Sequence, residues 1–502
     1  MKTRHKIFSV FLSGFIMIAF ACNTDNLEIP PSSLTEADYF KTESEFERAV
    51  LGVYARVTDL YNFNAGTILQ PLYFLPGDDV TRTGTDAFEH FGTLTSTNGT
   101  SSRFYERLYQ LIGRANIVVE KLDAEQGIYS NATLKSTHRG EVLFLRGFAF
   151  FNLWVYYGKA PVVTDRITAL ANLYPKESSG TELLDQAITD LTEAAGLLPS
   201  TWGGTQRGRV TSNAANGMLG KVLVFRGTVN KAPAVFTAAI TAFNKITGVS
   251  LLPNFGDNFD ATRENNAESL FEFQASTAGG DNIWLANEFD GAIGTMSAYW
   301  GNFYEGNSRN NNNVNYLATT KLLTALAGDP RLSLTVNTAS LTGKQLVKWS
   351  KADVTSGNGV SSGNNPRILR YADVLLLKAE ATLQSNGSTA EAINLINQIR
   401  TRARSMVPGG TAPADYPTTE TNRTTILNWI INERFIELAA EGHRWPDLKR
   451  WHIAGNIVLN NAFFDATNAP AMNFAVPKNL VFPIPISELD RNPNITQNPD
   501  YN

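Results

Sequence analysis

Apolar residues recur with the spacing of a helix face along most of the chain. The clearest stripe, in RYADVLLLKAEATLQ, has the spacing i, i+3, i+4, i+7 and consists of Ala372, Leu375, Leu376 and Ala379. After the turn SNG, the next segment begins with Ser388 and Glu391 at capping-box spacing. Its own stripe consists of Ala392, Leu395, Ile396 and Ile399. Two such helices form a hairpin, and because neither can bury its stripe alone, we expect the hairpins to stack.

The same pattern recurs in the first half of the chain. SSRFYERLYQLIGRANIVVEKLD is followed by EVLFLRGFAFFNLWVYYG, which is apolar nearly all round and is therefore predicted to be a central helix. SGTELLDQAITDLTEAAGLLP opens with Ser179 and Glu182, again at capping-box spacing. Ala239 and Phe243 have the small–large spacing of tetratricopeptide helices, although the strict signature of about 34 residues is missing. We therefore predict a mainly α fold of divergent tetratricopeptide-repeat hairpins.

The pattern changes in the middle of the chain. Residues 251–365 are rich in Gly, Asn, Ser and aromatic residues, as in DGAIGTMSAYWGNFYEGNSRNNNNVNY, and show no sustained helical period. We predict a loop-rich variable region with a few short strands, which the helical hairpins support. The predicted division is a signal peptide at 1–21, a lipidated tether at 22–35, an N-terminal helical region at 36–250, the variable ligand-binding region at 251–365 and a C-terminal region at 366–502.

The first residues have the pattern of a secretory signal peptide. Lys2, Arg4 and Lys6 precede an apolar run from Ile7 to Phe20, which is shorter than the roughly 20 apolar residues that span a bilayer. The run ends at Cys22, the single cysteine of the chain. A cysteine at this position resembles the first residue of a mature bacterial lipoprotein, whose thiol carries a lipid. The alternative is an unmodified thiol in a secreted protein.

Composition narrows the class of protein. The chain has 502 residues, of which 43% are hydrophobic and 18% charged, and its formal net charge is −4. This is the balance of a globular protein, and the mild acidity without a Lys/Arg run argues against a nucleic-acid partner. The length fits about three domains or one large body. With no cysteine after position 22, the body contains no disulfide.

Known catalytic and metal-binding motifs are absent from the sequence. No two of the five histidines have metal-ligand spacing, and there is neither a P-loop nor a dinucleotide fingerprint. GVSSG at 359–363 matches G-x-S-x-G but lacks the flanking strand and helix of a nucleophile elbow, so we expect a loop. Asp78 and Asp79 are adjacent and are better suited to a polar contact or a turn than to paired acid–base catalysis. The sequence predicts no cofactor and no metal site.

One charged segment, NERFIELAAEGHRWPDLKRW, could be mistaken for a catalytic cluster. Its three glutamates recur every four residues along one helix face, and we expect Gly442 to end that helix. A catalytic interpretation would choose Glu441 with His443. The number of nearby arginines and tryptophans instead favours an internal ion-pair and packing junction between two helices. Its members are Glu433, Glu437, Glu441, Arg434, Arg444, Arg450, Trp445 and Trp451.

Several segments together resemble the SusD/RagB family. They are FLRGFAFFNLWVYYGKAPVV and ANIVVEKLD in the first half, and ILRYADVLLLKAEA, AINLINQIRTRA, NERFIELAAEGHRWPDLKRW and VFPIPISELDRNPNITQNPDY in the second. The resemblance covers essentially the whole mature chain. It implies a lipoprotein on the outer surface of a Bacteroidetes cell, with divergent tetratricopeptide units. Such proteins bind glycans without hydrolysing them and form a lid on a SusC-like TonB-dependent outer-membrane transporter. Only Asp25 and Glu28 supply the acidic residues that follow the cysteine in surface-exported members.

The family has no fixed ligand motif, so the candidate ligand residues follow from composition. Sugars stack their apolar C–H faces on aromatic rings, and in the variable region such rings lie among Gly and Asn: Trp284, Tyr299, Trp300, Phe303 and Tyr304. Side chains that could bond the hydroxyl groups are Asp79, Asn302, Asn307 and Arg309. Four tryptophans in helical or signature segments are assigned to packing instead: Trp154, Trp429, Trp445 and Trp451.

Four functions are consistent with the sequence to different degrees. The first is a surface lipoprotein that binds oligosaccharides or polysaccharides and delivers them to the transporter. The second is a peptide-binding uptake component like RagB. A glycan hydrolase would need two carboxylates that converge in one cleft, and a scaffold that binds only proteins would show no carbohydrate binding. The sequence favours glycan binding without catalysis and does not identify the sugar.

Overall fold

The structure is a computed structural model that describes residues 36, 39–61, 69–276, 298–299, 303, 316–349, 361–464 and 472–501. Residues Glu47–Asn502 form one compact unit, and Met1–Phe46 form a separate one. The predicted signal peptide, the tether and Cys22 lie outside the described residues.

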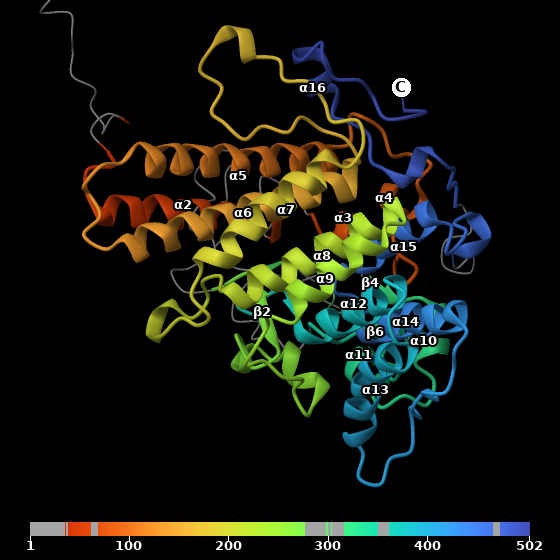
Figure 1. Cartoon of the computed structure of the whole chain (residues 1–502). Coiled ribbons are helices and arrows are strands. Elements are labelled where there is room, and N and C mark those ends of the chain that lie inside the picture. The colour runs from red at the N-terminus through yellow and green to blue at the C-terminus, as the bar shows by residue number, and fades with distance from the viewer. Residues whose placement is uncertain are drawn as a thin grey trace, which may run out of the picture. The chain divides into compact units, whose positions relative to one another are not determined.

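From residue 99 to 243, and again from 371 to 437, each main helix of the compact unit packs against the next one in the chain (Figure 1). The main helices of the first half are α2 (Glu43–Tyr61), α5 (Gly99–Ala124), α6 (Ala132–Tyr157), α7 (Glu182–Leu197), α8 (Ser212–Asn230) and α9 (Pro233–Phe243). Helix α6 contacts α5 on one side and α7 on another, and every residue from Gly140 to Tyr157 is buried. This burial confirms the prediction that the segment with apolar residues all round is central.

The second half continues the stack. Its main helices are α12 (Tyr371–Gln384), α13 (Thr389–Ser405), α14 (Arg423–Glu437) and α15 (Arg444–Ala454). The two predicted stripes of α12 and α13 face each other in one buried cluster, to which α14 adds Ile426 and Ile430. Ser388 caps α13 by accepting a hydrogen bond from the Glu391 amide at 3.2 Å. The cap predicted at Ser179 is wrong in detail, because the N-cap residue of α7 is Thr181. Ser179 instead donates a hydrogen bond to the Glu182 carboxylate at 2.8 Å.

Among the described residues the strands are few and short, as predicted, and every pair is antiparallel. The largest sheet has the order β1-β4-β6-β5, with β1 (Val80–Arg82), β4 (Tyr316–Ala318), β5 (Val336–Asn337) and β6 (Gln345–Leu346). Two further pairs join β2 (Ser269–Glu272) to β8 (Arg367–Arg370) and β3 (Ala298–Tyr299) to β7 (Ser361–Ser362). Short helices complete the connections: α3 (Gln70–Phe74), α4 (Ala87–His90), α10 (Thr320–Ala325), α11 (Leu332–Thr335) and α16 (Ile486–Arg491). The fold class is therefore confirmed.

Close contact between α8 and α9 depends on Gly220. A Cβ atom at this position would lie closer to the Phe243 ring than real Cβ atoms lie to their neighbours, whereas one at Gly113, on α5, would meet nothing within 4 Å. We expect Gly220→Ala to lower the free energy of unfolding by about 1–3 kcal/mol through overpacking. Gly113→Ala is the matched control and should raise it by about 0.5–1 kcal/mol, because alanine loses less backbone entropy in a helix. Urea unfolding of both variants checks this, and equal effects would contradict the assignment of Gly220 to close packing.

Candidate functional site

Most of the predicted ligand residues lie outside the described residues. This applies to Trp284, Trp300 and Tyr304, and to the possible hydrogen-bonding residues Asn302, Asn307 and Arg309. Tyr299 is described through its backbone, which pairs with Ser361 between β3 and β7. These residues therefore remain predictions. Residues 361–363 of the GVSSG match are described, and Ser361 and Ser362 form β7 rather than a turn before a helix.

Phe303 has a packing role, which corrects the prediction that it contacts a ligand. Its side chain has no exposed surface, and its ring centroid lies 5.3 Å from that of Phe74 and 5.2 Å from that of Tyr316. Because α3 carries Phe74 and β4 carries Tyr316, these contacts hold the Phe303 side chain against the body. An aromatic residue among Gly and Asn was expected to be exposed, but these long-range contacts bury it.

Asp79 also has a structural position, and its predicted ligand role is corrected in the same way. The residue is 2% exposed, and its Oδ2 accepts a hydrogen bond from the Ala440 amide at 2.8 Å. Burial raises its pKa to about 6. The neighbouring Asp78 accepts hydrogen bonds from Arg444 and Lys321, each at 2.5 Å. The two carboxylates therefore hold the turn between α14 and α15 and the start of α10.

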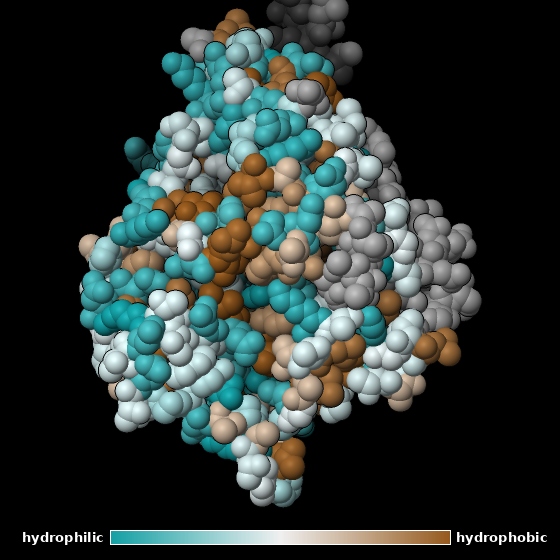
Figure 2. Space-filling model, turned by 90° about the vertical axis from the view of Figure 1, so that its right-hand side faces the viewer, coloured by the Kyte–Doolittle hydropathy of each residue, from teal (hydrophilic) through white to brown (hydrophobic). Residues whose placement is uncertain are grey.

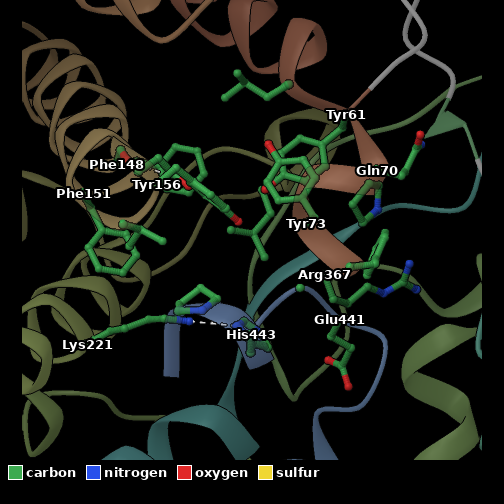
Figure 3. A pocket seen from close by; sticks show the side chains of 18 of the residues that line it. Tyr61, Gln70, Tyr73, Phe148, Phe151, Tyr156, Lys221, Arg367, Glu441 and His443 are labelled. Atoms are coloured by element: carbon green, nitrogen blue, oxygen red, sulfur yellow. Dashed lines mark hydrogen bonds between the residues drawn. The ribbon is translucent and has the colours of Figure 1, made fainter. Parts of the chain in front are cut away.

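A small cavity lies between the end of α2, α3, α6 and the α14–α15 turn (Figure 3). On one wall the rings of Tyr61 and Tyr73 are parallel, with centroids 5.5 Å apart, and Tyr156 meets Tyr73 edge-on at 6.0 Å. On the other wall Figure 3 shows Lys221 extending toward His443. The volume of about 80 Å³ is room for a few water molecules and is smaller than the roughly 300–1,000 Å³ of typical ligand pockets.

The polar wall of this cavity is a fixed hydrogen-bond chain. Lys221 Nζ donates to Asp373 Oδ2 at 2.8 Å and to His443 Nδ1 at 3.0 Å. Burial, and then the charge of Lys221, lower the pKa of His443 to about 4, so the ring is neutral at pH 7. Since Nδ1 accepts from the ammonium, the ring proton is on Nε2, which has no hydrogen-bond partner among the described residues. Burial also raises the pKa of Tyr73 well above its usual range, and this hydroxyl too has no described partner.

This arrangement supports the body of the protein and does not suit hydrolysis of a glycan. His443 and Glu441 both line the cavity, but Glu441 is bonded by Arg370 and Lys348 at 2.8 Å each. Two convergent carboxylates open to a sugar chain, which glycoside hydrolysis needs, are not found in this cavity. The sequence did not indicate the roles of Tyr61, Tyr73 and Lys221, because their meeting depends on helices far apart in the chain.

The predicted ion-pair junction is confirmed, but its pairs differ from those expected. The carboxylates of Glu433, Glu437 and Glu441 bind cations from other elements: Arg331, Lys348, Arg370, Arg400 and Arg402. The arginines within the segment bind other acids: Arg434 pairs with Asp373 and Asp447, Arg444 with Asp78, and Arg450 with Glu380 and Asp447. The junction therefore joins α14 to several distant segments.

Helix α14 ends at Glu437, five residues before the predicted end at Gly442. Buried cations stabilise this early end: Lys348 Nζ and Arg370 Nη2 donate to the Glu437 carbonyl at 3.0 and 2.8 Å. Ala440 then takes a positive φ of 57° while its amide donates to Asp79. Tertiary hydrogen bonds override the local helical pattern here.

A surface groove lies on another side of the unit. Figure 2 shows the face on the right of Figure 1, where apolar side chains gather around a hollow between polar ones. On this side, a groove of about 790 Å³ lies between α10, α14 and residues 457–464. Its apolar lining includes Ile431, Phe435 and Phe463, and Lys321 Nζ lies 3.8 Å from the centre of the Phe463 ring. Its volume is within the range of roughly 300–1,000 Å³ that is usual for ligand pockets.

The described residues contain neither a metal centre nor a helix that could span a membrane. Within the described ranges, no group of three or more His, Cys, Asp or Glu side chains is placed to hold a metal ion. In the same ranges, no helix combines the length and the hydrophobicity needed to cross a bilayer. The tryptophans assigned to packing fit that role: Trp154, Trp445 and Trp451 are buried, and half-buried Trp429 stacks on Tyr416 at 4.3 Å.

Comparisons with known proteins cover both halves of the chain. Residues 257–501 match the model of the SusD family, and residues 79–224 match a model described as starch-binding and associating with the outer membrane. SusD-like protein P2 of Formosa agariphila is 26% identical, with 95% of this chain and 96% of the relative covered. A SusD-like protein of Bacteroides ovatus is 23% identical, with 86% and 80% covered.

Solved structures share the fold. A SusD homologue from Bacteroides thetaiotaomicron superposes with a TM-score of 0.77 at 22% identity, covering 93% of this chain and 99% of its own. A laminarin-binding SusD-like protein has a TM-score of 0.74 at 24% identity, with 92% and 100% covered. Surface glycan-binding protein A from Bacteroides fluxus has a TM-score of 0.74 at 20% identity, with the same coverage.

Proposed function

This chain belongs to the SusD/RagB family, and from that premise we propose that it binds oligosaccharides or polysaccharides at the outer membrane and delivers them to a SusC-like TonB-dependent transporter. The match to the family over most of the chain is the observation that carries the proposal. Relatives of the same fold are named for binding laminarin and surface glycans. The carboxylates of Glu433, Glu437 and Glu441 are all bonded by cations of the protein, which suits a structural role for them rather than catalysis.

We place the ligand site in the variable region. Phe303 and the β1–β4 pair join the described parts of this region to the buried interior of the body, and binding residues are commonly carried by loops that such a scaffold supports. Trp284, Tyr299, Trp300 and Tyr304 are the proposed stacking residues. Cys22 is the proposed lipid anchor, which would keep the binding body at the membrane beside the transporter.

Replacing Trp300 with alanine is expected to weaken glycan binding at least about tenfold, because an aromatic anchor in a binding site is commonly worth more than 1 kcal/mol. Affinity electrophoresis and calorimetry of residues 23–502 against a polysaccharide panel that includes laminarin would measure this. Trp429→Ala is the matched control, since Trp429 stacks on Tyr416 and is assigned to packing. It should leave the affinity unchanged.

Other outcomes separate the competing functions. If the Trp300→Ala variant still binds the glycan, the proposed function stands, but the ligand site lies elsewhere, in one of the described grooves. If the protein binds peptides but no glycan, the result would instead support a role in peptide uptake. Release of reducing ends from a bound glycan would contradict a purely binding role.

A further inference from the structure

A second groove with mixed polar and apolar lining lies at the loop that leads into α8. It consists of two hollows of about 450 Å³ each, which share Gly208, Arg209, Phe271 and Glu272 as lining residues. Trp202 lines the first hollow and Gln274 the second. We name the two hollows together the Trp202 groove. Each has a volume within the range of roughly 300–1,000 Å³ that is usual for small-molecule sites.

The aromatic ring of this groove is held in one orientation. Trp202 is half-buried, its Nε1 donates to the Val210 carbonyl at 2.7 Å, and the Arg209 guanidinium lies 4.5 Å from its ring centre. Arg209 is itself fixed by ion pairs with Glu47 and Glu141, each at 2.5 Å. A ring that is already ordered loses little entropy when a ligand stacks on it, which favours its use in binding.

A set of hydrogen-bonded amide and carboxylate groups also lines the groove, Asn265 in the first hollow, Gln274 in the second and Glu272 in both. Asn265 and Gln274 bond each other reciprocally, with Nδ2 to Oε1 at 2.7 Å and Nε2 to Oδ1 at 3.0 Å. Glu272 Oε2 accepts from the Asn265 amide at 3.1 Å, whereas Glu272 Oε1 has no hydrogen-bond partner among the described residues although Glu272 is 2% exposed. Gly208 makes room for this set, because a Cβ there would collide with the Gln274 side chain.

The charges of the groove are mostly compensated within the protein. Arg209 is paired with two glutamates, and Glu272 Oε1 lies 3.5 Å from Arg367 Nε. The remaining lining groups include the neutral side chains of Thr201, Asn266 and Ser269. An aromatic face beside uncharged donors and acceptors matches a pyranose ring, which has an apolar C–H face and a rim of hydroxyl groups. Arg207 also lines the first hollow, where its Nη2 donates to the Asn265 carbonyl at 2.8 Å.

We propose that the Trp202 groove is a second carbohydrate-binding site, which takes a neutral pyranose unit of an oligosaccharide stacked on Trp202, with hydroxyls bonded by Asn265 and Gln274. The inference rests on the proposed glycan-binding function but concerns a place outside the predicted ligand residues of the variable region. Two sites on one body let a long glycan bind at two points, which raises the overall avidity.

Calorimetry and saturation-transfer NMR on residues 23–502 would test this with neutral hexasaccharides of β-1,3-glucose, β-1,4-glucose, α-1,4-glucose and β-1,4-xylose, and with tetragalacturonate as the acidic comparison. Trp202→Ala should weaken the binding of at least one neutral probe about tenfold or more. Thr201→Arg should do the same by filling the groove, and because Thr201 is exposed, this change leaves the core intact. Thermal unfolding of both variants checks the fold.

The outcomes separate this inference from the proposed function. Loss of neutral-probe binding in both groove variants, with binding retained in Trp300→Ala, would support the groove and contradict the location of the ligand site in the variable region. Loss in Trp300→Ala alone, with both groove variants within twofold of the wild-type protein, would overturn the second site and leave the proposed function in place. Binding of tetragalacturonate alone, or of no probe, would overturn the second site as stated.

Discussion

Replacing Glu437 with glutamine is expected to lower the free energy of unfolding by about 3–5 kcal/mol, the usual cost of removing one partner from a buried ion pair. Its carboxylate accepts hydrogen bonds from Arg331, Arg370 and Arg402 at 2.8, 2.6 and 2.5 Å. Glu437 and Arg331 have no exposed surface, so water cannot replace the lost charge. The variant leaves three buried guanidinium groups with one negative charge fewer.

Urea unfolding followed by circular dichroism would measure the effect of Glu437→Gln. The matched control is Glu120→Gln, because Glu120 pairs with Arg166 at 2.7 Å but is 40% exposed. An exposed pair contributes at most about 1 kcal/mol, so this control should be close to the wild-type protein. A loss below about 1 kcal/mol for Glu437→Gln would contradict the view that the junction depends on this carboxylate.

The same variant should change the pH dependence of stability. Burial alone would raise the pKa of Glu437, but the charges of Arg402, Arg370 and Arg331 hold it well below its usual range. The unfolded chain therefore takes up this proton at higher pH than the folded protein does. The stabilisation is fully present above the ordinary glutamate pKa and is lost as the pH falls toward the folded-state value. The difference between wild-type protein and variant should narrow across that acid range.

Replacing Trp445 with alanine is expected to cost about 3–5 kcal/mol, since it removes the largest kind of side chain from a closed site. Trp445 has no exposed surface, and its ring centroid lies 5.7 Å from that of Phe91, 6.3 Å from Phe474 and 6.5 Å from Phe482. Its Nε1 has no hydrogen-bond partner among the described residues, so the loss is one of packing. The cavity left by the indole would remove the contacts of α15 with both the 80–98 region and the C-terminal segment.

Thermal unfolding and hydrogen exchange would test the Trp445 prediction together. Exchange should rise at the Phe482 amide, which donates to the Tyr156 carbonyl at 2.7 Å and connects the C-terminal segment to α6. Trp429→Ala is the control of equal chemistry, because Trp429 is only half-buried, and it should cost less than half as much. Unchanged exchange at Phe482 despite a lower melting temperature would show that the C-terminal segment is held elsewhere.

The local sequence pattern was sufficient to predict the helical part of the protein. Stripes at 3.6-residue spacing, the Ser388 cap and the apolar α6 each depend on residues within one or two turns, so the sequence alone predicts these helices and their hairpin order. The clustering of Glu433, Glu437 and Glu441 likewise indicates a buried ion-pair junction. So many charged residues and tryptophans in one helical segment favour ion pairing and packing inside the protein over other roles.

The pairing of those charges, and the surroundings of single residues, were decided by tertiary structure. Phe303 is buried by α3 and β4, Asp79 is bonded to a turn 361 positions later in the chain, and α14 ends early because distant cations bind its last carbonyls. None of these partners lies near in sequence. The Gly- and Asn-rich composition around Phe303 predicts an exposed ring instead of a buried one. The sequence by itself determined the helical hairpins, the family and the kind of chemistry, because these depend on short-range periodicity and on residue type. Which ring is exposed, which acid meets which base and where a groove forms depend on contacts between distant segments, and only the folded chain decides them.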